Sequence, residues 1–499
     1  MEKIVIIGGV AAGPKAACHV KRLLPDAKVT IIDQDKLISY GGCGIPYLIG
    51  GEVADGDALR STSYHMVRDE YFFAEAKGVE VKSETLAVSI DREKKVVHLR
   101  DIRNGKKDTI EYDKLVLATG SRPNRLSIPG NDLEGVFAIA NLDSALKIQK
   151  SLMKNGVEKA VVVGGGAIGI EMAEALEDMW GLETTIVEYM PQLLPNIVDW
   201  HNAAMLQKHL EENNINVFTS EAVTEIKGDD QGRVTGVFTD KQTLEADLVI
   251  MSVGVRPCDQ LAKEAGLLVS PKGGIVVNNR LQTSDPNIFA AGDCIETNHL
   301  VSGKKAFAPL GSLANREGRV VGDNLAGIPS TFNGITGSFI MKAYDACIGA
   351  TGLSLAAAKA EGYDAEIAVT IQSDRAHFMA GQEPMTLTMV FDKKNRKVLG
   401  LQGFGQMGDG VMARINPAAA LLAKNAVIED FSNLEMAYAP PFSTAVDILN
   451  ATANVADNIA KGRFRTVSIN DFKQWLEKPD SHQDWIAVDV RSENDSQSL

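Results

Sequence analysis

Short apolar runs alternate with amphipathic segments along the chain, and the clearest of these runs lead into glycines. Residues 4–7 are predicted to form a buried strand, 11–24 a helix and 28–32 a second strand. Residues 160–163 begin a second series of the same kind, in which the next strand ends at Glu188. Apolar strands joined by helices are typical of parallel sheets covered on both faces. The pattern predicts an α/β fold with two Rossmann-like units.

The first strand and helix are joined by a glycine-rich turn, Gly8-Gly9-Val10-Ala11-Ala12-Gly13. Its first glycine permits a tight turn and its last lets the helix and strand pack closely, so that free helix amides face a pyrophosphate. Asp33 ends the unit, twenty residues after Gly13, at a position where an acid binds ribose hydroxyls. Val10 replaces the usual middle glycine. Taken alone, this turn is a weak signal.

The second series repeats the device with every glycine in place. Gly164, Gly166 and Gly169 follow the strand, and Glu188 lies nineteen residues after Gly169. Two complete strand–turn–helix–strand–acid units in one chain predict two dinucleotide sites. The alternative is that one of the two sites is vestigial.

Composition narrows the class of protein. The 499 residues correspond to about three domains at roughly 150 residues each. The net charge of −14 and the lack of a basic stripe argue against nucleic acid as a partner. The apolar N-terminal run is too short for a membrane span and lacks a signal-peptide cleavage pattern. Five scattered cysteines form neither a disulfide framework nor a metal site, so we expect a cytoplasmic protein without metal.

Two further stretches, KLVLATGSRP at 114–123 and SDPNIFAAGDC at 284–294, complete a recognisable set. With the glycine turns, they resemble the two-dinucleotide-fold flavoprotein disulfide reductases over about residues 1–450. The resemblance implies FAD in the first unit and NAD in the second. The residues matching FAD-binding motifs are Gly8, Gly9, Ala12, Gly13, Asp33, Ala118, Thr119, Gly120, Gly292 and Asp293. Those matching the NAD site are Gly164, Gly166, Ile168, Gly169, Glu188 and Gly254.

The resemblance also implies a domain plan. An FAD domain is expected at 1–118 and 250–327, an NAD domain at 119–249, an α+β dimerisation domain at 328–450 and a linker at 451–462. Residues 463–499 resemble the opening of a rhodanese domain. A complete rhodanese needs about 100 residues and its own cysteine, so we expect a fragment here.

Glu188 bears on the choice of nicotinamide cofactor. A carboxylate at this position accepts hydrogen bonds from the ribose hydroxyls and repels a 2′-phosphate. The following residues, Tyr189, Met190 and Pro191, include no arginine to attract such a phosphate. NADH is therefore the expected cofactor.

Cys43 lies alone in the stretch SYGGCGIPYLIGG, so a disulfide at this sulfur has to form with a substrate. The stretch resembles the single-cysteine branch of the family, which contains coenzyme A-disulfide reductases, NADH-dependent persulfide reductases, NADH oxidases and NADH peroxidases. Gly41, Gly42 and Gly44 are expected to open the space around the sulfur. A helix beginning at Pro46 would stabilise a thiolate. The alternative is that Cys43 is a small buried residue.

The oxidases and peroxidases of this branch usually carry a histidine in the first glycine loop, where this chain has Val10, Ala11 and Ala12. This difference argues against peroxide as the main substrate, and His19, further along the helix, is expected to be exposed. Tyr438, in AYAPPFSTAVDILN, corresponds to a tyrosine that protonates a leaving thiolate at the partner's flavin and cysteine in a homodimer. The alternative is interface packing alone.

The match to coenzyme A-binding residues is partial. Arg22 and Ser39 fit the pattern, and Arg60 is a third candidate contact. The departures are Gly42 for an asparagine, Val446 for a lysine and Phe378 for a second tyrosine. We therefore expect coenzyme A species to bind less tightly than in a dedicated disulfide reductase, and small persulfides or polysulfides to be reduced at least as well.

The function predicted is FAD-dependent, NADH-driven reduction of coenzyme A disulfide, coenzyme A persulfide or polysulfide through Cys43. Two alternatives remain open at this point. One is an NADH oxidase that uses the same cysteine as a sulfenic acid. The other is a flavin-bound redox sensor without turnover.

Overall fold

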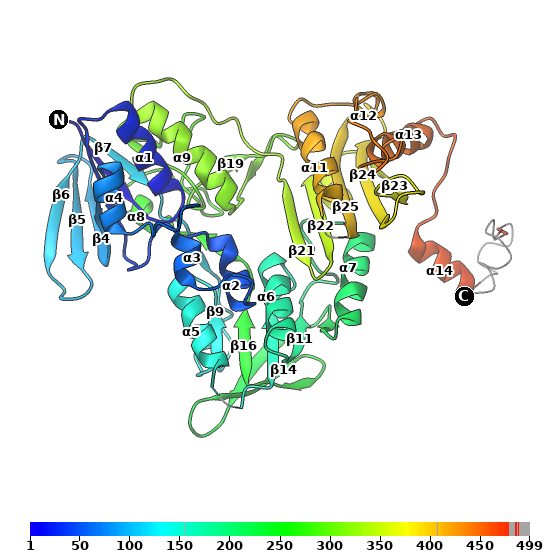
Figure 1. Cartoon of the computed structure of the whole chain (residues 1–499), viewed down its shortest axis with the longest axis horizontal. Coiled ribbons are helices and arrows are strands. Elements are labelled where there is room, and N and C mark those ends of the chain that lie inside the picture. The colour runs from blue at the N-terminus through cyan, green and yellow to red at the C-terminus, as the bar shows by residue number, and fades with distance from the viewer. Residues whose placement is uncertain (155, 407, 479–484, 487, 489–499) are drawn as a thin grey trace.

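The computed structural model describes residues 1–154, 156–406, 408–478, 485, 486 and 488, which form three lobes and a C-terminal helix (Figure 1). The first lobe is built on a parallel sheet with the strand order β18-β7-β1-β2-β3. These strands are β1 (Lys3–Ile7), β2 (Lys28–Ile32), β3 (Glu80–Lys82), β7 (Lys114–Leu117) and β18 (Ile288–Ala290). Ile7 is in register with both Ile32 and Leu117, so the turns after β1, β2 and β7 meet at one edge of the sheet.

Two helices distant in sequence pack side by side on this sheet (Figure 1). They are α1 (Ala12–Leu23) and α9 (Gly311–Leu325). A Cβ atom on Gly318 would lie 2.5 Å from the carbonyl oxygen of Ala12, so only glycine permits this approach. An antiparallel sheet of β4 (Thr85–Asp91), β5 (Val96–Asp101) and β6 (Lys107–Glu111) extends the lobe.

The second lobe repeats the parallel plan in the order β12-β11-β10-β16-β9. Its strands are β9 (Val136–Ala138), β10 (Lys159–Val163), β11 (Glu183–Val187), β12 (Asn216–Phe218) and β16 (Leu248–Met251). Its helices are α5 (Leu142–Leu152), α6 (Ala167–Asp178) and α7 (Trp200–Glu212). The prediction of two Rossmann-like units is thus confirmed. Strand β16, the last strand of this sheet in chain order, runs to Met251, slightly past the expected domain boundary at 249.

The chain passes between these lobes on two short antiparallel strands, β8 (Ser121–Pro123) and β17 (Val255–Pro257). A small antiparallel sheet, which completes the second lobe, consists of β13 (Val223–Gly228), β14 (Val234–Thr239) and β15 (Thr243–Glu245).

The third lobe is an antiparallel sheet in the order β21-β22-β25-β24-β23, covered by helices. Its strands are β21 (Phe339–Ala343), β22 (Ala346–Gly352), β23 (Ala365–Ser373), β24 (Pro384–Asp392) and β25 (Val398–Gln406). Its helices are α10 (Leu355–Ala360), α11 (Asp409–Leu422), α12 (Ile428–Ser432) and α13 (Ile448–Ala460).

Helix α13 covers most of the segment 451–462, which is expected to be a linker helix. It packs against β23 and β24, and Leu449, Thr452, Ala453 and Ala456 are buried along one side. Residues three and four apart share a helix face, so this spacing provides a continuous stripe for the core. Residues 451–460 therefore belong to the third domain.

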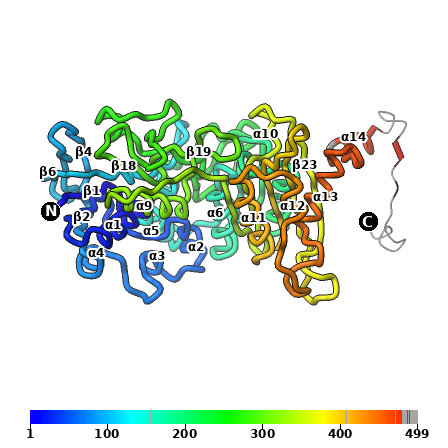
Figure 2. Tube along the Cα trace, turned by 90° about the horizontal axis from the view of Figure 1, so that it is seen from above, coloured from blue at the N-terminus to red at the C-terminus, as the bar shows by residue number. Residues whose placement is uncertain are grey.

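Among the described residues of the segment expected to resemble rhodanese, one helix is present. Helix α14 (Ile469–Glu477) begins after Ser468, whose side chain accepts a hydrogen bond from the Asp471 amide. Figure 2 shows α14 beyond α13, at the end of the molecule away from the N-terminus. Asp489, Val490 and Arg491 lie outside the described residues, so the rhodanese resemblance stays a prediction. No helix in the described part of the chain is both long and apolar enough to cross a membrane.

Candidate active site

The turn after β1 can only be made with glycines at two positions. Gly8 has φ +116°, and a Cβ there would lie 2.0 Å from the Ala118 carbonyl oxygen, while one on Gly13 would lie 1.9 Å from the Gly8 carbonyl oxygen. Helix α1 begins at Ala12 with no side-chain cap and no acid in its first turn. Its first amides are therefore available to an anion. Val10 does not prevent this geometry, because the two glycines that make the turn are present.

Asp33 closes this first site at the end of β2. One carboxylate oxygen accepts a 2.5 Å hydrogen bond from the Gly9 amide and the other a 2.8 Å bond from the Asp35 amide. Burial raises the pKa of Asp33 to about 6, although both hydrogen bonds oppose the shift. The acid is thus fixed beside the turn, which is the position needed to bind a ribose.

Two other segments reach the same edge of the sheet. The Thr119 hydroxyl donates to the Cys258 carbonyl at 2.6 Å, and Gly120 adopts φ +67°. The Ser121 hydroxyl donates to an Asp293 carboxylate oxygen at 3.0 Å, and burial raises the pKa of Asp293. FAD requires a glycine turn and free helix amides for its pyrophosphate and an acid that accepts hydrogen bonds from its ribose hydroxyls. The residues of this first site therefore fit that cofactor.

The second unit has the same construction. Gly164 has φ +110°, and Gly169 packs against the Gly164 carbonyl. A Cβ on Gly169 would lie 2.0 Å from that carbonyl oxygen. A Cβ on Gly166, by contrast, would meet nothing within 4 Å, so this position is open to a ligand. Helix α6 follows without a side-chain cap or a first-turn acid, and Ile168 in that turn is exposed. Gly254, with φ +83°, follows β16. These residues fit the pyrophosphate of a nicotinamide dinucleotide.

Glu188 is buried at the end of β11, in the position that Asp33 occupies in the first unit. Its two oxygens accept hydrogen bonds from the Gly165 amide at 2.6 Å and the Met190 amide at 2.7 Å. The carboxylate is therefore held in one orientation before any cofactor binds.

Cys43 is exposed, and the alternative of a small buried cysteine is wrong. It lies in a 3₁₀ turn, Gly42–Gly44, directly before α2 (Ile45–Ile49). Its Sγ is 3.6 Å from the position that a Cβ on Gly311 would take, at the start of α9. Helix α9 has no side-chain cap. The thiol thus lies at the N-terminal end of a long helix from another part of the sequence.

The glycines around Cys43 have different roles. A Cβ on Gly44 would lie 2.4 Å from Leu59, so this glycine is required by packing. Cβ atoms on Gly41 or Gly42 would meet no atom closer than 3.9 Å. Only Gly41 and Gly42 therefore keep the surroundings of the sulfur open.

Helix α6 is joined to the other two domains by three glutamates at three-residue spacing. The Tyr47 hydroxyl donates to Glu171 at 3.2 Å, and burial raises the pKa of Glu171 to about 7. Lys342 lies 3.1 Å from Glu174, and the Tyr344 hydroxyl donates to Glu177 at 2.8 Å. Because Tyr47 lies on α2, the Glu171 contact connects α6 to the helix that directly follows the turn carrying Cys43.

The three predicted coenzyme A contacts lie at separate places on the first lobe. Arg22 is exposed in the last turn of α1, whereas Ser39 is buried and its amide donates to the Gly9 carbonyl at 2.8 Å. Arg60 ends α3 (Gly56–Arg60) and is paired with Asp57 at 3.1 Å. No hydrogen bond or ion pair in the described structure joins the three, and their substrate role stays a prediction.

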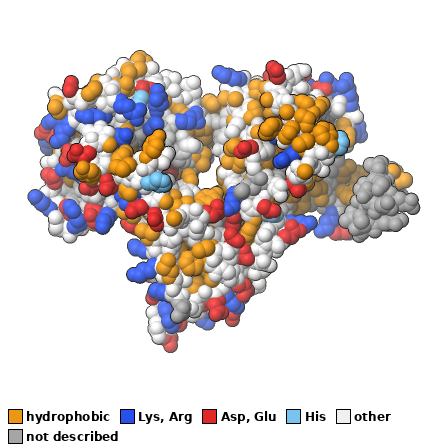
Figure 3. All heavy atoms as spheres, in the orientation of Figure 1, with side chains coloured by type: hydrophobic (Ala, Val, Ile, Leu, Met, Phe, Trp, Pro, Cys, Tyr) orange, Lys and Arg blue, Asp and Glu red, His pale blue; other side chains and the backbone are white. Residues whose placement is uncertain are grey.

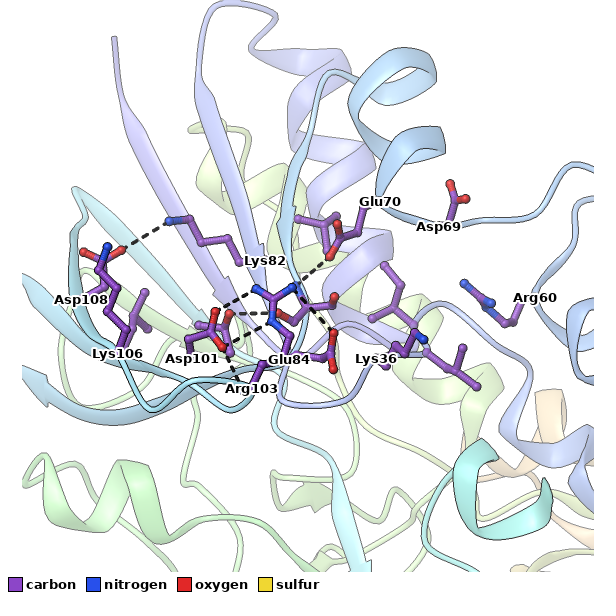
Figure 4. A pocket seen from close by; sticks show the side chains of 16 residues that line it. Lys36, Arg60, Asp69, Glu70, Lys82, Glu84, Asp101, Arg103, Lys106 and Asp108 are labelled. Carbon is purple, nitrogen blue, oxygen red and sulfur yellow. Dashed lines mark hydrogen bonds and ion pairs between the residues drawn. The ribbon is translucent and has the colours of Figure 1, made fainter. Parts of the chain in front are cut away.

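Arg60 lines a cavity of about 590 Å³ between β3, β4 and β5. Figure 4 shows Arg60 and Lys36 at one end and a group of opposite charges at the other. In that group Arg103 lies 2.8 Å from Asp101 and 4.0 Å from Glu84. The charges at this end neutralise one another, and Arg60 at the other end is itself paired with Asp57.

Tyr438 is half exposed in the segment between α12 and α13, and no described contact within the chain joins it to Cys43. The segment is anchored by a buried ion pair of 2.6 Å between Arg414 on α11 and Asp447. The same lobe exposes Phe378, Met412, Phe442 and Val446. Figure 3 shows hydrophobic side chains gathered over this lobe around α11.

The expectation that His19 is exposed is wrong. Its side chain is buried between α1 and α9, with Nε2 2.6 Å from Asp323. The reason is the close approach of the two helices at Gly318 and Gly322. A Cβ on Gly322 would lie 2.8 Å from the His19 ring. His19 is thus committed to an interhelical contact.

Cys294 packs in the core, with Sγ 3.4 Å from the carbonyl oxygens of Leu117 and Ala291. Burial raises its pKa to about 12, so it remains a thiol. Sequence reasoning missed Gly311, the α6 glutamates and a buried acid on α9, Glu317. A glycine opening a helix was available as a signal for the first of these, but nothing marks the acids as special.

Comparison with known proteins gives consistent matches over nearly the whole chain. The family model described as pyridine nucleotide-disulphide oxidoreductase matches residues 2–309, and the dimerisation domain of that family matches 341–449. An NAD(P)H coenzyme A polysulfide/persulfide reductase of Pyrococcus horikoshii is 34% identical over 454 residues, covering 91% of this chain and 98% of the relative. An NADH oxidase of Methanocaldococcus jannaschii is 35% identical with the same coverage. The solved structure of an NAD-dependent persulfide reductase from A. fulgidus has a TM-score of 0.92 and 38% identity, covering 95% of this chain and 86% of that one.

Proposed function

The chain belongs to the pyridine nucleotide-disulphide oxidoreductase family, and we propose that it is an NADH-dependent reductase of a low-molecular-weight disulfide or persulfide. Membership confirms the resemblance drawn from the sequence, and enzymes of this family use FAD and NAD(P)H. The single observation that supports the substrate class is the exposed, unpaired thiol of Cys43 at the start of α9. A redox-active cysteine without an enzyme partner has to form its disulfide with the substrate.

The chemistry follows from the residues around the sulfur. The α9 N-terminus favours negative charge, and hence a thiolate, at Cys43. This thiolate attacks a disulfide or persulfide sulfur and forms a mixed disulfide, releasing a thiol or hydrosulfide. FAD bound at the first unit would supply two-electron transfer between NADH and sulfur. Two electrons and one proton from NADH, with one further proton from solvent, release the second thiol and restore Cys43.

Completion of the site by a second copy of the chain is part of the proposal. The dimerisation domain exposes Tyr438, Phe442 and Val446. An exposed group of large apolar side chains is typical of an interaction surface. In a homodimer this surface is covered, and Tyr438 approaches the partner's thiol as a proton donor to the leaving sulfur. All five cysteines are free, which suits a reducing compartment such as the cytoplasm.

Substrate preference tests the proposal directly. We expect anaerobic NADH oxidation with coenzyme A persulfide or inorganic polysulfide to have a kcat/KM at least equal to that with coenzyme A disulfide. Val446 is 56% exposed where dedicated disulfide reductases often carry a lysine, so this position provides no cation for the coenzyme A phosphates. Stopped-flow measurement of NADH loss with the three substrates decides the order, and a strong preference for the disulfide would refute it.

An NADH oxidase is the second candidate, because two relatives carry that name. The glycine loop beside the first site contains Val10, Ala11 and Ala12, which cannot assist peroxide chemistry as a histidine would. Oxygen consumption that accounts for most NADH oxidation, even with disulfide or persulfide present, would favour the oxidase. Flavin reduction by NADH without turnover on any acceptor would favour the redox sensor.

The C-terminal segment is expected to be dispensable for this activity. Residues 463–469 and most of α14 are exposed, and the chain has no cysteine after Cys347 to act as a sulfurtransferase nucleophile. Deleting residues 463–499 should change kcat/KM by no more than about twofold, as expected for surface changes away from a site. The full chain should show no thiosulfate sulfurtransferase activity. Loss of reductase activity in a truncated protein with unchanged FAD content and circular dichroism would contradict this prediction.

A further inference from the structure

Glu317 is a fully buried carboxylate on α9 that lies against the Gly292–Asp293 turn. Its Oε2 accepts a 2.7 Å hydrogen bond from the Gly292 amide, but no described residue donates to its Oε1. A buried carboxylate oxygen without a donor strongly disfavours the ionised state. The geometry therefore favours uptake of a proton by this side chain.

The charges around Glu317 do not cancel this tendency. Burial is the main cause that raises the pKa of Glu317 to about 7, and the carboxylate of Asp293 raises it further. The Gly292 hydrogen bond and Arg316 act in the opposite direction. On the facing helix α1, Lys15 lies beside Gly318, the residue that follows Glu317. At neutral pH the group is thus poised between its two protonation states.

Glu317 is also close to the redox centre. Helix α9 begins at Gly311, against the sulfur of Cys43, and Glu317 lies six residues further on, about 9 Å along the helix axis. The turn that it contacts carries Asp293, one of the residues that fit FAD. Two-electron reduction adds negative charge to this centre, and a nearby negative charge in a poorly screened interior favours the neutral form of a carboxyl group.

We propose that Glu317 takes up one solvent proton when the enzyme is reduced and releases it on reoxidation, as a positioning residue that touches neither thiol nor substrate. The step is balanced, because NADH delivers two electrons and one proton as hydride while the carboxylate gains a separate proton and forms no bond to the substrate. The inference rests on the proposed function in placing FAD at the first unit. It goes beyond that function in assigning a redox-linked proton to a side chain outside the catalytic groups.

The test is the pH dependence of the flavin midpoint potential in the holoenzyme. The pKa of Glu317 is about 7 in the oxidised enzyme and should be higher in the reduced enzyme. Between these two pH values, reduction of the wild type should take up to one extra proton per two electrons. That proton changes the reduction equilibrium tenfold per pH unit, about 30 mV for a two-electron couple. Glu317→Gln keeps the acceptor for the Gly292 amide but cannot ionise, so the extra slope should disappear.

Glu221→Gln is the matched control. Glu221 is also buried, but it accepts hydrogen bonds from Thr239 at 2.6 Å and Gln242 at 3.0 Å in the second lobe. This variant should keep the wild-type slope. Identical slopes in the wild type and Glu317→Gln would overturn the proposal.

If Glu317→Gln fails to fold, a second measurement tests the proposal on the wild type alone. Proton uptake on anaerobic reduction of the wild type by reduced methyl viologen, an electron donor whose oxidation releases no proton, is followed with an indicator dye. It should exceed its value at pH 5.5 by up to one proton per flavin near pH 7.5. No excess would overturn the inference. If the protein binds FAD and shows the excess but reduces no disulfide or persulfide, only the proposed function fails; if it binds no FAD, both fail.

Discussion

Replacing Cys43 with serine is expected to abolish disulfide-dependent NADH oxidation while FAD binding and flavin reduction by NADH persist. The expected loss in kcat is about 10³-fold or more, the size typical of removing a catalytic nucleophile. A hydroxyl cannot form the mixed disulfide, and no other cysteine is exposed. Cys294 and Cys347 are buried, and partial burial raises the pKa of Cys18 and of Cys258. The fold should not change, since Cys43 is exposed and makes no buried contact that a serine would lose.

Two measurements on the same preparation separate chemistry from folding. Flavin absorbance gives the FAD content, and anaerobic stopped-flow gives both the rate of flavin reduction by NADH and the rate of turnover with disulfide or persulfide. Cys18→Ser is the matched control, because Cys18 is a half-buried thiol on α1 that packs against the hydrophobic core of the first lobe. We expect this variant to retain near wild-type turnover. Substantial disulfide turnover by Cys43→Ser would show that the sulfur is not the reacting group.

The parts of the site that could be predicted from sequence are those governed by local geometry. Gly8 and Gly164 both have φ above +100°, and in each a Cβ would strike the carbonyl oxygen of a neighbouring strand end. Such a turn requires glycine whatever the rest of the chain does. Asp33 and Glu188 were predictable for the same reason, because each follows the strand that lies next to its glycine turn.

The parts that sequence reasoning missed depend on contacts between segments far apart in the chain. His19 and Asp323 are separated by 304 positions, and only the pairing of α1 with α9 makes the histidine buried. The same pairing buries Glu317. Its environment is set by the Gly292 amide, 25 residues away on a different element. No periodicity or motif in the local sequence distinguishes these acids from ordinary helix-surface residues.

The second large effect concerns the nicotinamide cofactor. With Glu188 ionised, NADH is expected to have a kcat/KM about 30-fold or more above that of NADPH, equivalent to about 2 kcal/mol or more. The amides of Gly165 and Met190 hold its two oxygens, which fixes the carboxylate where we propose that the 2′-position of the ribose binds. A phosphate at that position would face a buried like charge and would also lose the hydroxyl-to-carboxylate hydrogen bond.

Glu188→Ser removes both the charge repulsion of the phosphate and the hydrogen bond from the ribose hydroxyl to the carboxylate. It removes the negative charge and frees the Gly165 and Met190 amides, which become donors for a phosphate, so the NADH-to-NADPH ratio of kcat/KM should fall by about tenfold or more. Glu183→Gln, at the exposed start of the same strand and 3.6 Å from Lys159, should leave the ratio unchanged. Initial rates with both cofactors at a fixed concentration of polysulfide provide the comparison. Equal kcat/KM values for NADH and NADPH in the wild type would contradict the role of Glu188, and an unchanged ratio in Glu188→Ser would assign any preference to other residues of the pocket.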